Sequence, residues 1–410
     1  MIWHQLTHTR SHTVSRIALS RIALSRIAVS RIAISIALLF ALSACIPSVY
    51  DQPYPVETVQ LPRDEAAHRA PIEWWYYTGH LTDENGDRYG FELTFFKAYT
   101  PPDLPLLAGI PAYVLVDKGH VAHFAITDID RERFNMAERT DFWGYQADAN
   151  YQVFDVFVGG WRARRQGDSH LIEAHNRDYR INLQLTPSKP VALHGDPPGI
   201  QSMGPGGISY YLSYTRMNVS GEIDVNCNWL GCNTLQVTGQ AWHDHQWGDF
   251  DISSYAGWDW FSLQFDDNSE LMLYLIREPS GNYLTIEGSY IDQAGEVQFL
   301  AQDAISVTPT GYTWESESTG AIYPLEWDIA VADPTNNVAI NVRVSPVLDN
   351  QEMDTRASTG IVYWEGAMQV SGSHPGVGYM ELTNYDLYPF GQTDENTPLK
   401  PLRNPLTGGS

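Results

Sequence analysis

Short apolar runs separated by polar turn residues make up most of the chain after its first 70 residues. Residues 74–81 and residues 89–97 are rich in apolar side chains and flank a turn that contains an Asn-Gly pair. This arrangement predicts a β-hairpin. Residues 263–265 and 270–276 repeat it around a second polar turn. Helical periodicity is scarce, so the pattern predicts a mainly β protein.

The strand-rich part of the chain is too long for one β-barrel or sandwich, so two domains are expected. The similarity of the two hairpins indicates an internal duplication. We place an N-terminal domain at residues 71–248, a C-terminal domain at residues 249–395 and a tail at residues 396–410. Residues 99–112 and 195–207 are candidate loops over a barrel mouth, or surface loops without a role. Further strands are predicted at residues 121–127, 151–158, 179–185, 208–214, 283–290, 338–344 and 362–370.

The first 44 residues have the order of a bacterial lipoprotein signal peptide. A basic repeat of Ser-Arg-Ile-Ala-Leu is followed by the apolar residues 32–40 and by Leu-Ser-Ala-Cys, which ends at Cys45. The apolar run is short for a membrane span. We expect cleavage before Cys45, lipidation of that cysteine and a proline-containing tether over residues 45–70. An ordinary membrane anchor or a secretory peptide without lipid is the alternative.

The residue after Cys45 and the charge balance bear on the compartment and the partners. By resemblance to Gram-negative sorting rules, Ile46 instead of aspartate at this place favours the periplasmic face of the outer membrane. The formal net charge is −24, and removal of the basic signal peptide makes the mature chain more acidic. This charge argues against nucleic acid or an anionic membrane surface as a partner. The lipid anchor is then the expected membrane contact.

Cys227 and Cys232 lie close together in a polar, turn-rich segment. In an exported chain such a pair is expected to form a local disulfide. A zinc site would need two further ligands, and none stands at the spacing of a zinc ribbon. We therefore predict a disulfide here, and we predict neither a metal nor a cofactor.

Residues 237–249 concentrate two histidines, two tryptophans and two acids in a run that otherwise has the pattern of a strand. Strand alternation places His243, His245 and Trp247 on one face. Asp244 lies on the other face, between Trp242 and Gln246. Neighbouring imidazoles transfer protons, ligate metals or sit in buried hydrogen-bond networks. The run is the first candidate for chemistry, and these alternatives stay open.

Six spaced segments, all in one order, carry a family resemblance: residues 73–81, 89–96, 123–128, 207–216, 243–248 and 363–367. Together they resemble the carotenoid 1,2-hydratase (hydroxyneurosporene synthase) and AttH-like family of lipocalin-like proteins. The similarity spans roughly residues 72–388. It implies two tandem lipocalin-like antiparallel β-barrels packed together, with activities that range from carotenoid hydration to hydrolysis.

In the hydratase branch of that family, the implied reaction is addition of water to a terminal isoprenoid double bond. It needs an acid that protonates the alkene, stabilisation of the cation and a base for water. The resemblance implies proton transfer by His245 and cation–π stabilisation by Trp247, with Tyr274 as a third member and His243 and Asp244 beside them. Arg277 stands close to where an acid is expected after Tyr274. The substitute acids that the sequence offers are Asp244, Asp249, Asp259 and Glu73.

Four tryptophans are candidate ligand-binding residues, and they are equally candidates for barrel core or packing between domains. They are Trp74, Trp75, Trp258 and Trp260. Glu73 beside the first pair is expected to be a buried acid held by an arginine such as Arg216. A serine hydrolase is disfavoured, because the chain lacks a Gly-x-Ser-x-Gly elbow and its strand-to-helix context.

Three hypotheses for the function follow. The first is a lipid-anchored envelope enzyme that performs hydratase- or hydrolase-like acid/base chemistry on an apolar isoprenoid or lipid-like substrate. The second is a lipocalin-like carrier of an apolar ligand without catalysis, for which the same aromatic residues supply only burial. The third is a scaffold that presents loops to another envelope protein. Substitution His245→Ala separates them: we expect it to abolish turnover under the first, to leave ligand affinity within a few fold under the second and to do little under the third.

Overall fold

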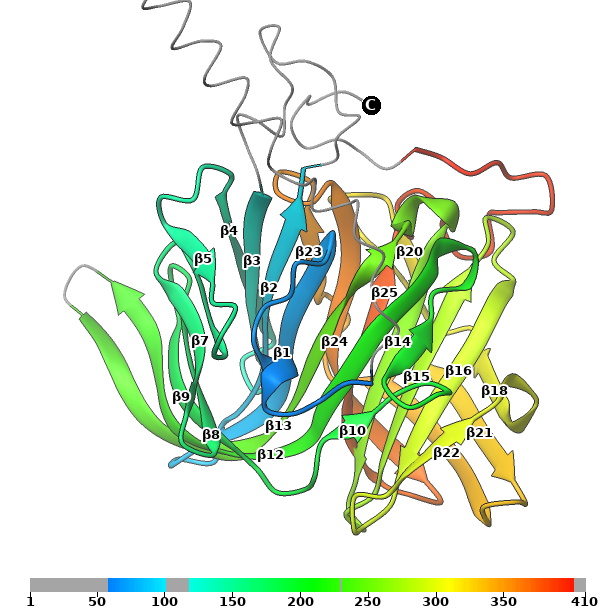
Figure 1. Ribbon diagram of the computed structural model, residues 1–410, viewed down its shortest axis with the longest axis horizontal. Coiled ribbons are helices and arrows are strands. Elements are labelled where there is room, and N and C mark those ends of the chain that lie inside the picture. The colour runs from blue at the N-terminus through cyan, green and yellow to red at the C-terminus, as the bar shows by residue number, and fades with distance from the viewer. Residues whose placement is uncertain (1–57, 101–117, 229–230, 402–410) are drawn as a thin grey trace, which may run out of the picture. The chain divides into compact units, whose positions relative to one another are not determined.

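The computed structural model describes residues 58–100, 118–228 and 231–401. The strands form two large antiparallel sheets that lie side by side (Figure 1). Each sheet curls into a nearly closed barrel (Figure 1), and in each the first strand in the chain pairs with the last. The prediction of a mainly β protein with two tandem antiparallel barrels is confirmed. The helical segments among the described residues are short 3-10 turns: η2 (Arg63–Glu65), η3 (Gly204–Gly206), η4 (Ile252–Ser254) and η5 (Gln302–Ala304).

The first barrel is a sheet of 13 strands. They are β1 (Ile72–Asp83), β2 (Arg88–Tyr99), β3 (Lys118–Asp128), β4 (Arg133–Asp141), β5 (Ala147–Ala149), β6 (Asp155–Val158), β7 (Trp161–Gln166), β8 (Ser169–His175), β9 (Arg180–Pro187), β10 (Ala192–Leu193), β11 (Ile200–Ser202), β12 (Gly207–Asn228) and β13 (Gly231–Phe250). Their order is β4-β3-β2-β1-β13-β12-β9-β8-β7-β6-β5, and β10 and β11 pair with β12.

The second barrel is a sheet of 10 strands. They are β14 (Gly257–Phe265), β15 (Glu270–Arg277), β16 (Tyr283–Ile291), β17 (Val297–Leu300), β18 (Ile305–Pro309), β21 (Trp327–Asp333), β22 (Val338–Pro346), β23 (Glu352–Thr355), β24 (Ile361–Gly372) and β25 (Gly376–Thr383). Their order is β17-β16-β15-β14-β25-β24-β22-β21-β18, and β23 pairs with β24. A separate two-stranded sheet holds β19 (Thr313–Glu315) and β20 (Ile322–Pro324).

The two hairpins singled out in the sequence occupy equivalent places in the two barrels. In each barrel the first strand of the hairpin, β1 or β14, also pairs with the last strand of that barrel, β13 or β25. The chain passes from one sheet to the other over residues 251–256. This matching topology agrees with an internal duplication.

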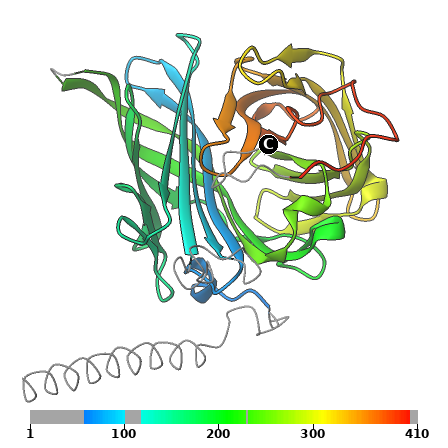
Figure 2. The ribbon, with the colours of Figure 1, turned by 90° about the horizontal axis from the view of Figure 1, so that it is seen from above.

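Strands at the contact between the barrels are buried on both faces, which explains their nearly continuous apolar sequences. In β1, Trp75 and Tyr77 belong to the core of the first barrel, and Trp74 and Tyr76 pack with residues of the second. By contrast β9 alternates buried and exposed residues, because its outer face meets solvent. Figure 2 shows the two sheets against each other from above.

Residues 58–70 are not the free tether that the sequence predicts. Val59 and Ala70 are buried against the first barrel. Glu65 is buried as well and accepts a hydrogen bond from Tyr214. The N–H of Ala67 donates to the carbonyl of Asn150 over 2.9 Å. The segment lacks periodicity because it packs through individual side chains and not as a strand or helix, so the hydrophobic pattern could not reveal it.

Some sequence predictions concern residues outside the described ranges, and others concern residues that the structure describes. The predicted signal peptide, Cys45 and the tether up to residue 57 lie outside the described residues, as do residues 101–117 of the first predicted loop. Residues 195–207 are described, and Met203 within them is buried against the second barrel. Cys227 and Cys232 form a disulfide where β12 turns into β13. Among the described residues, no helix has the length and apolar character needed to cross a membrane.

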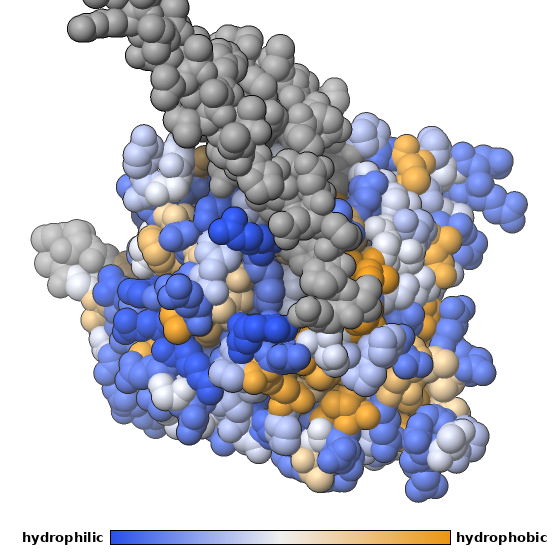
Figure 3. All heavy atoms as spheres, in the orientation of Figure 1, coloured by the Kyte–Doolittle hydropathy of each residue, from blue (hydrophilic) through white to orange (hydrophobic). Residues whose placement is uncertain are grey.

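The surface in Figure 3 is largely hydrophilic over the first barrel, and hydrophobic residues gather in the lower middle of the view near β10. Polar side chains join the two barrels in the interior. His194 Nδ1 lies 2.9 Å from Ser289 Oγ, and Thr127 donates to Gln351 over 2.7 Å. These buried bonds fix the register of the two barrels, since separating them leaves polar groups without partners.

Candidate functional site

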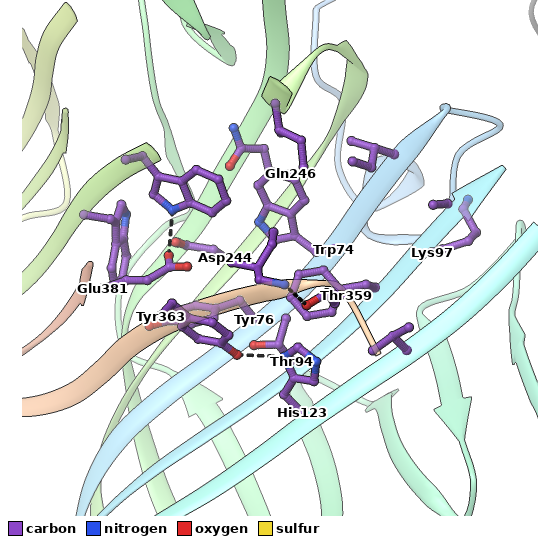
Figure 4. Close-up of a pocket in the computed structure, with 18 of the residues that line it drawn as sticks. Trp74, Tyr76, Thr94, Lys97, His123, Asp244, Gln246, Thr359, Tyr363 and Glu381 are labelled. Atoms are coloured by element: carbon purple, nitrogen blue, oxygen red, sulfur yellow. Dashed lines mark hydrogen bonds between the residues drawn. The ribbon is translucent and has the colours of Figure 1, made fainter. Parts of the chain in front are cut away.

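A cavity of about 300 Å³ lies between the outer faces of the two barrels. Its walls come from β1, β2, β3, β12 and β13 of the first barrel and from β14, β15, β24 and β25 of the second. Large apolar side chains fill both barrel interiors. The volume lies within the range of small-molecule sites in proteins. This cavity, shown in Figure 4, is therefore the candidate ligand site.

Aromatic rings form much of the cavity wall. Trp74 and Tyr76 line it from β1, Trp258 and Trp260 from β14, and Tyr274 from β15. The rings of Tyr76 and Trp260 meet edge to face with their centroids 5.2 Å apart. Such rings bury apolar ligands, and their electron-rich faces attract positive charge.

Two carboxyl groups in the cavity wall are direct neighbours. Glu365 on β24 and Glu381 on β25 are register partners across an antiparallel pair, so their side chains share one face. Tyr76 donates a hydrogen bond of 2.6 Å to Glu365 Oε1, and Trp258 Nε1 donates one of 3.0 Å to Glu381 Oε2. Two like charges at this spacing repel each other. The pair therefore favours a state in which at least one of the two carboxyls keeps its proton.

The surroundings separate the pKa values of this pair. Burial, together with the charges of Glu381 and Glu92, raises the pKa of Glu365 well above its usual range. Burial also raises the pKa of Glu381, to about 7, although the hydrogen bond from Trp258 opposes the shift. Glu365 is thus protonated near neutral pH, and Glu381 is divided between its two forms. Pairs of this kind supply an acid and a base in one site.

Asp244 is the third carboxyl group of the wall, and three donors hold it. Tyr211 donates over 2.6 Å, Trp242 Nε1 over 2.5 Å, and Ser213 also donates. Burial raises its pKa to about 7, against the lowering effect of these hydrogen bonds. Because its oxygens are already engaged, Asp244 fixes the wall, and it is a poorer proton donor to a ligand than Glu365.

A hydrogen-bonded histidine closes another side of the cavity. His123 Nδ1 lies 2.7 Å from the Tyr363 hydroxyl, and His123 Nε2 lies 3.0 Å from Ser358 Oγ. Burial lowers the pKa of His123 to about 3, so the ring is neutral at physiological pH. In Figure 4 the His123–Tyr363 contact joins a strand of the first barrel to one of the second.

The structure brings five of the predicted site residues to the cavity and leaves four away from it. Those that line it are Asp244, Tyr274, Trp74, Trp258 and Trp260. Those on the opposite face of β1 and β13 are Trp75, His243, His245 and Trp247. The predicted alternation of β13 is confirmed, and the cavity lies on its Asp244 face. His243 Nδ1 instead contacts the carbonyl of Tyr76 at 3.0 Å, and its ring stacks on Tyr77.

His245 belongs to a buried ionic cluster on that opposite face. Its Nε2 lies 2.9 Å from Glu73 Oε1, and His68 Nδ1 lies 2.8 Å from the same oxygen. Lys97 pairs with the other oxygen of Glu73. Trp247 stacks on His68 with ring centroids 3.8 Å apart. The cluster ties residues 58–71 to the first barrel, and we call it the Glu73 clamp.

The Glu73 clamp has the spacing of a metal site, since ligand atoms of His68, Glu73 and His245 lie within 4.8 Å of one another. The charge of Glu73 is already balanced by Lys97. Burial alone would raise the pKa of Glu73, but Lys97 and the hydrogen bonds from His245 and His68 lower it overall. The arrangement therefore fits an ion-pair network better than a cation site.

The expected Glu73–Arg216 pair is wrong. Arg216 Nε instead donates to Glu270 Oε1 over 2.5 Å, and Lys189 pairs with the other oxygen of Glu270. The location of the two residues explains this pairing, because Arg216 on β12 faces Glu270 on β15 of the other barrel. Glu73 takes its cation from Lys97, its register partner on β2.

Of the acids suggested as substitutes, Asp244 alone borders the cavity among the described residues. Asp249 is exposed, and Asp259 pairs with Arg277 over 3.1 Å. Sequence reasoning missed Glu365 and Glu381 as a pair. A signal was present, because a hairpin turn near residue 374 places these two glutamates opposite each other. No local pattern in the sequence indicates that another barrel covers the face that these two glutamates share.

We expect His245→Gln to lower stability and to leave any cavity chemistry nearly intact. The substituted amide still reaches Glu73, but it loses the stacking contact with Trp75 at 4.9 Å. Urea denaturation should show a loss of about 1–3 kcal/mol. Ligand affinity of the folded variant should stay within a few fold. A folded, stable variant that binds nothing would place His245 at the ligand site.

The family of the chain follows from comparison with known proteins. The profile of the AttH-like family matches residues 52–385. The fold and the two-barrel topology described above agree with this match. The chain therefore belongs to the AttH-like family. A comparison with curated protein sequences finds no match.

Solved structures share the fold. A crystal structure of a candidate AttH protein from Nitrosomonas europaea is 31% identical, with a TM-score of 0.70, and the alignment covers 81% of this chain and 98% of that one. Kievitone hydratase from Nectria haematococca is 15% identical, with a TM-score of 0.62, and the alignment covers 79% of this chain and 92% of that one. At 15% identity the second likeness shows the fold alone.

Proposed function

We propose that this protein is a hydratase-like enzyme that adds water to, or removes water from, a carbon–carbon double bond of an apolar substrate held between the barrels. The observation that carries the proposal is the Glu365–Glu381 pair in an aromatic cavity. The shared fold of kievitone hydratase adds support. Lipid anchoring at Cys45 and residence at the periplasmic face of the outer membrane stay predictions from the sequence.

The first step uses Glu365 as the acid. Glu365 Oε2 has no hydrogen-bond partner among the described residues, and the side chain borders the cavity. The proton leaves this carboxyl and forms a C–H bond with the less substituted alkene carbon, which leaves a cation on the other carbon. The faces of Trp258 and Trp260 and the carboxylate form of Glu381 stabilise that cation.

The second step uses Glu381 as the base. Water forms a C–O bond with the cation, and one of its protons passes to the Glu381 carboxylate. The proton then passes from Glu381 back to Glu365. The two residues are neighbours across the strand pair. The sum of the steps is one water added, with both carboxyls restored. Removal of water follows the same path in reverse.

The test is incubation of the purified protein with lipid extract from source cells in heavy-oxygen water. The proposal predicts a compound that gains one labelled water with the wild type and not with Glu365→Gln. The competing function is an apolar-ligand carrier, which the largely aromatic wall also allows. A compound that co-purifies unchanged, with no labelled product from any fraction, would support the carrier and contradict the enzyme.

The pH profile follows from the pKa values of the pair. Glu381 must be ionised to accept a proton, so kcat/KM should rise with pH through about 7. It should fall again only where Glu365, whose pKa is raised well above its usual range, loses its proton. In Glu381→Gln the rising limb should vanish and kcat should fall about a hundredfold. A rising limb that persists in this variant would assign the base to another group.

A further inference from the structure

The cavity has an unbalanced charge. Asp244, Glu365 and Glu381 line it, and no basic side chain among the described residues forms a hydrogen bond or ion pair with any of them. Lys97 also borders the cavity, but its ammonium group pairs with Glu73. His123 is neutral because burial lowers its pKa to about 3. The carboxylate forms of Glu381 and Asp244 therefore give the wall a negative charge that no described basic side chain balances.

Glu365 provides a second and independent observation. Its side chain is 1% exposed, and Oε2 has no hydrogen-bond partner among the described residues. A buried polar atom without a partner is costly, and in native proteins it calls for an explanation. Since Glu365 borders the cavity, this atom indicates that the cavity holds a ligand or water beside the carboxyl group.

We propose that the cavity binds apolar molecules that carry a positive charge, such as alkylammonium compounds, with the charge held between the Glu381 carboxylate and the rings of Trp258 and Trp260. The inference rests on the proposed function, because an ammonium group reproduces the charge of the cation formed during hydration. The inference goes beyond the proposed function because it names a class of ligand. The Glu381 carboxylate and the aromatic faces attract the same charge, and the apolar wall accommodates the remainder of the molecule.

Two other ligand classes fit less well. An anionic ligand, such as a fatty acid or a phosphate ester, would meet the carboxylate forms of Glu381 and Asp244 and no available cation among the described residues. A metal ion would need closely spaced ligand atoms, and within the described ranges Asp244, Glu365 and Glu381 do not form such a group. An organic cation with its charge spread over methyl or methylene groups does not need that spacing.

Affinity for a cation should depend on the ionisation of Glu381. The pKa of this group is raised to about 7, so its negative form, which attracts the ligand, becomes predominant above that pH. A permanently charged ligand should then bind about tenfold more tightly near pH 8 than near pH 6. Several titratable or charged groups face Glu381 from the packed elements. The acids and the one base are Glu365 on β24, Asp244 on β13, Glu92 on β2, and Asp259 on β14 with its partner Arg277 on β15. The tyrosines are Tyr76 on β1, Tyr255 before β14, Tyr274 on β15 and Tyr363 on β24.

The test is calorimetry of the full protein with four probes that share one apolar body: phenylbutyltrimethylammonium, phenylbutylamine, phenylbutanol and phenylbutyrate. We expect both cations to bind at least about a hundredfold more tightly than the anion near pH 8, and the alcohol to show no gain with pH. Equal binding of the anion and the cations would overturn the inference. So would a complete absence of binding by both cations.

Two variants separate this inference from the proposed function. Glu381→Gln should remove most of the cation preference and reduce the pH dependence to the part that Asp244, whose pKa is also raised to about 7, contributes. Glu365→Gln should keep both, because Glu365 is neutral, although it removes turnover under the proposed function. The control is the double variant Glu173→Gln/Glu315→Gln, whose carboxyl groups lie on exposed positions of β8 and β19. A cation preference that survives Glu381→Gln undiminished, or that is lost equally in the control, would assign the preference to the general acidity of the protein and contradict the inference.

Discussion

Glu365→Gln is expected to reduce turnover by about a thousandfold, within the range for loss of a general acid. The substitution keeps the size of the side chain and its acceptor for the 2.6 Å hydrogen bond from Tyr76. It removes the proton that the alkene receives. Initial rates of labelled-water incorporation, measured beside ligand affinity, should show a fall in kcat with KM within a few fold.

The control for this loss is Asp244→Asn, which alters a carboxyl group of the same wall. Asp244 accepts three hydrogen bonds and has no free oxygen for a substrate. We expect this variant to lose affinity and stability more than kcat. Equal losses of kcat in the two variants, or an unchanged kcat in Glu365→Gln, would remove Glu365 from the role of proton donor.

Glu73→Gln is expected to have the largest effect on stability, a loss of about 3–5 kcal/mol. The substitution leaves Lys97 buried without its ionic partner and weakens the contacts to His68 and His245. The folded-state pKa of Glu73 is lowered, so its contribution is present above its unfolded pKa and is lost as pH falls through the lowered value. Urea denaturation near neutral pH measures this loss.

Glu352→Gln serves as the matched control for the Glu73 clamp. Glu352 is also buried, but hydroxyl groups such as those of Ser316 and Tyr323 hold it, and the structure shows no basic partner for it among the described residues. We expect it to cost about 1–3 kcal/mol. A loss in Glu73→Gln no larger than in this control would mean that the Lys97 pair does not stabilise the first barrel.

The strands were predictable because their residues repeat at the period of a sheet. The sequence placed the hairpins of residues 74–97 and 263–276, and it assigned Asp244 and His245 to opposite faces of one strand. It failed for residues 58–70, since individual buried contacts such as that of Val59 leave no periodic signal.

The site was harder to predict because both faces of β13 are buried. The histidines and tryptophans on the His245 face are residue types that often take part in catalysis. That face nevertheless meets the core of the first barrel and the Glu73 clamp. The glutamates that meet in the cavity come from β24 and β25, and each looks like an ordinary acid in its own segment. Their significance depends on a second barrel that covers them, which no local pattern records.

The state of Glu365 in the resting protein tests the account most directly. Infrared difference spectra between the wild type and Glu365→Gln near neutral pH distinguish a protonated carboxyl from a carboxylate without any substrate. The account predicts that the wild type shows the carbonyl band of a protonated carboxyl and that the variant lacks it. A variant that loses carboxylate bands instead would show that Glu365 is ionised, and would contradict its role as the proton donor.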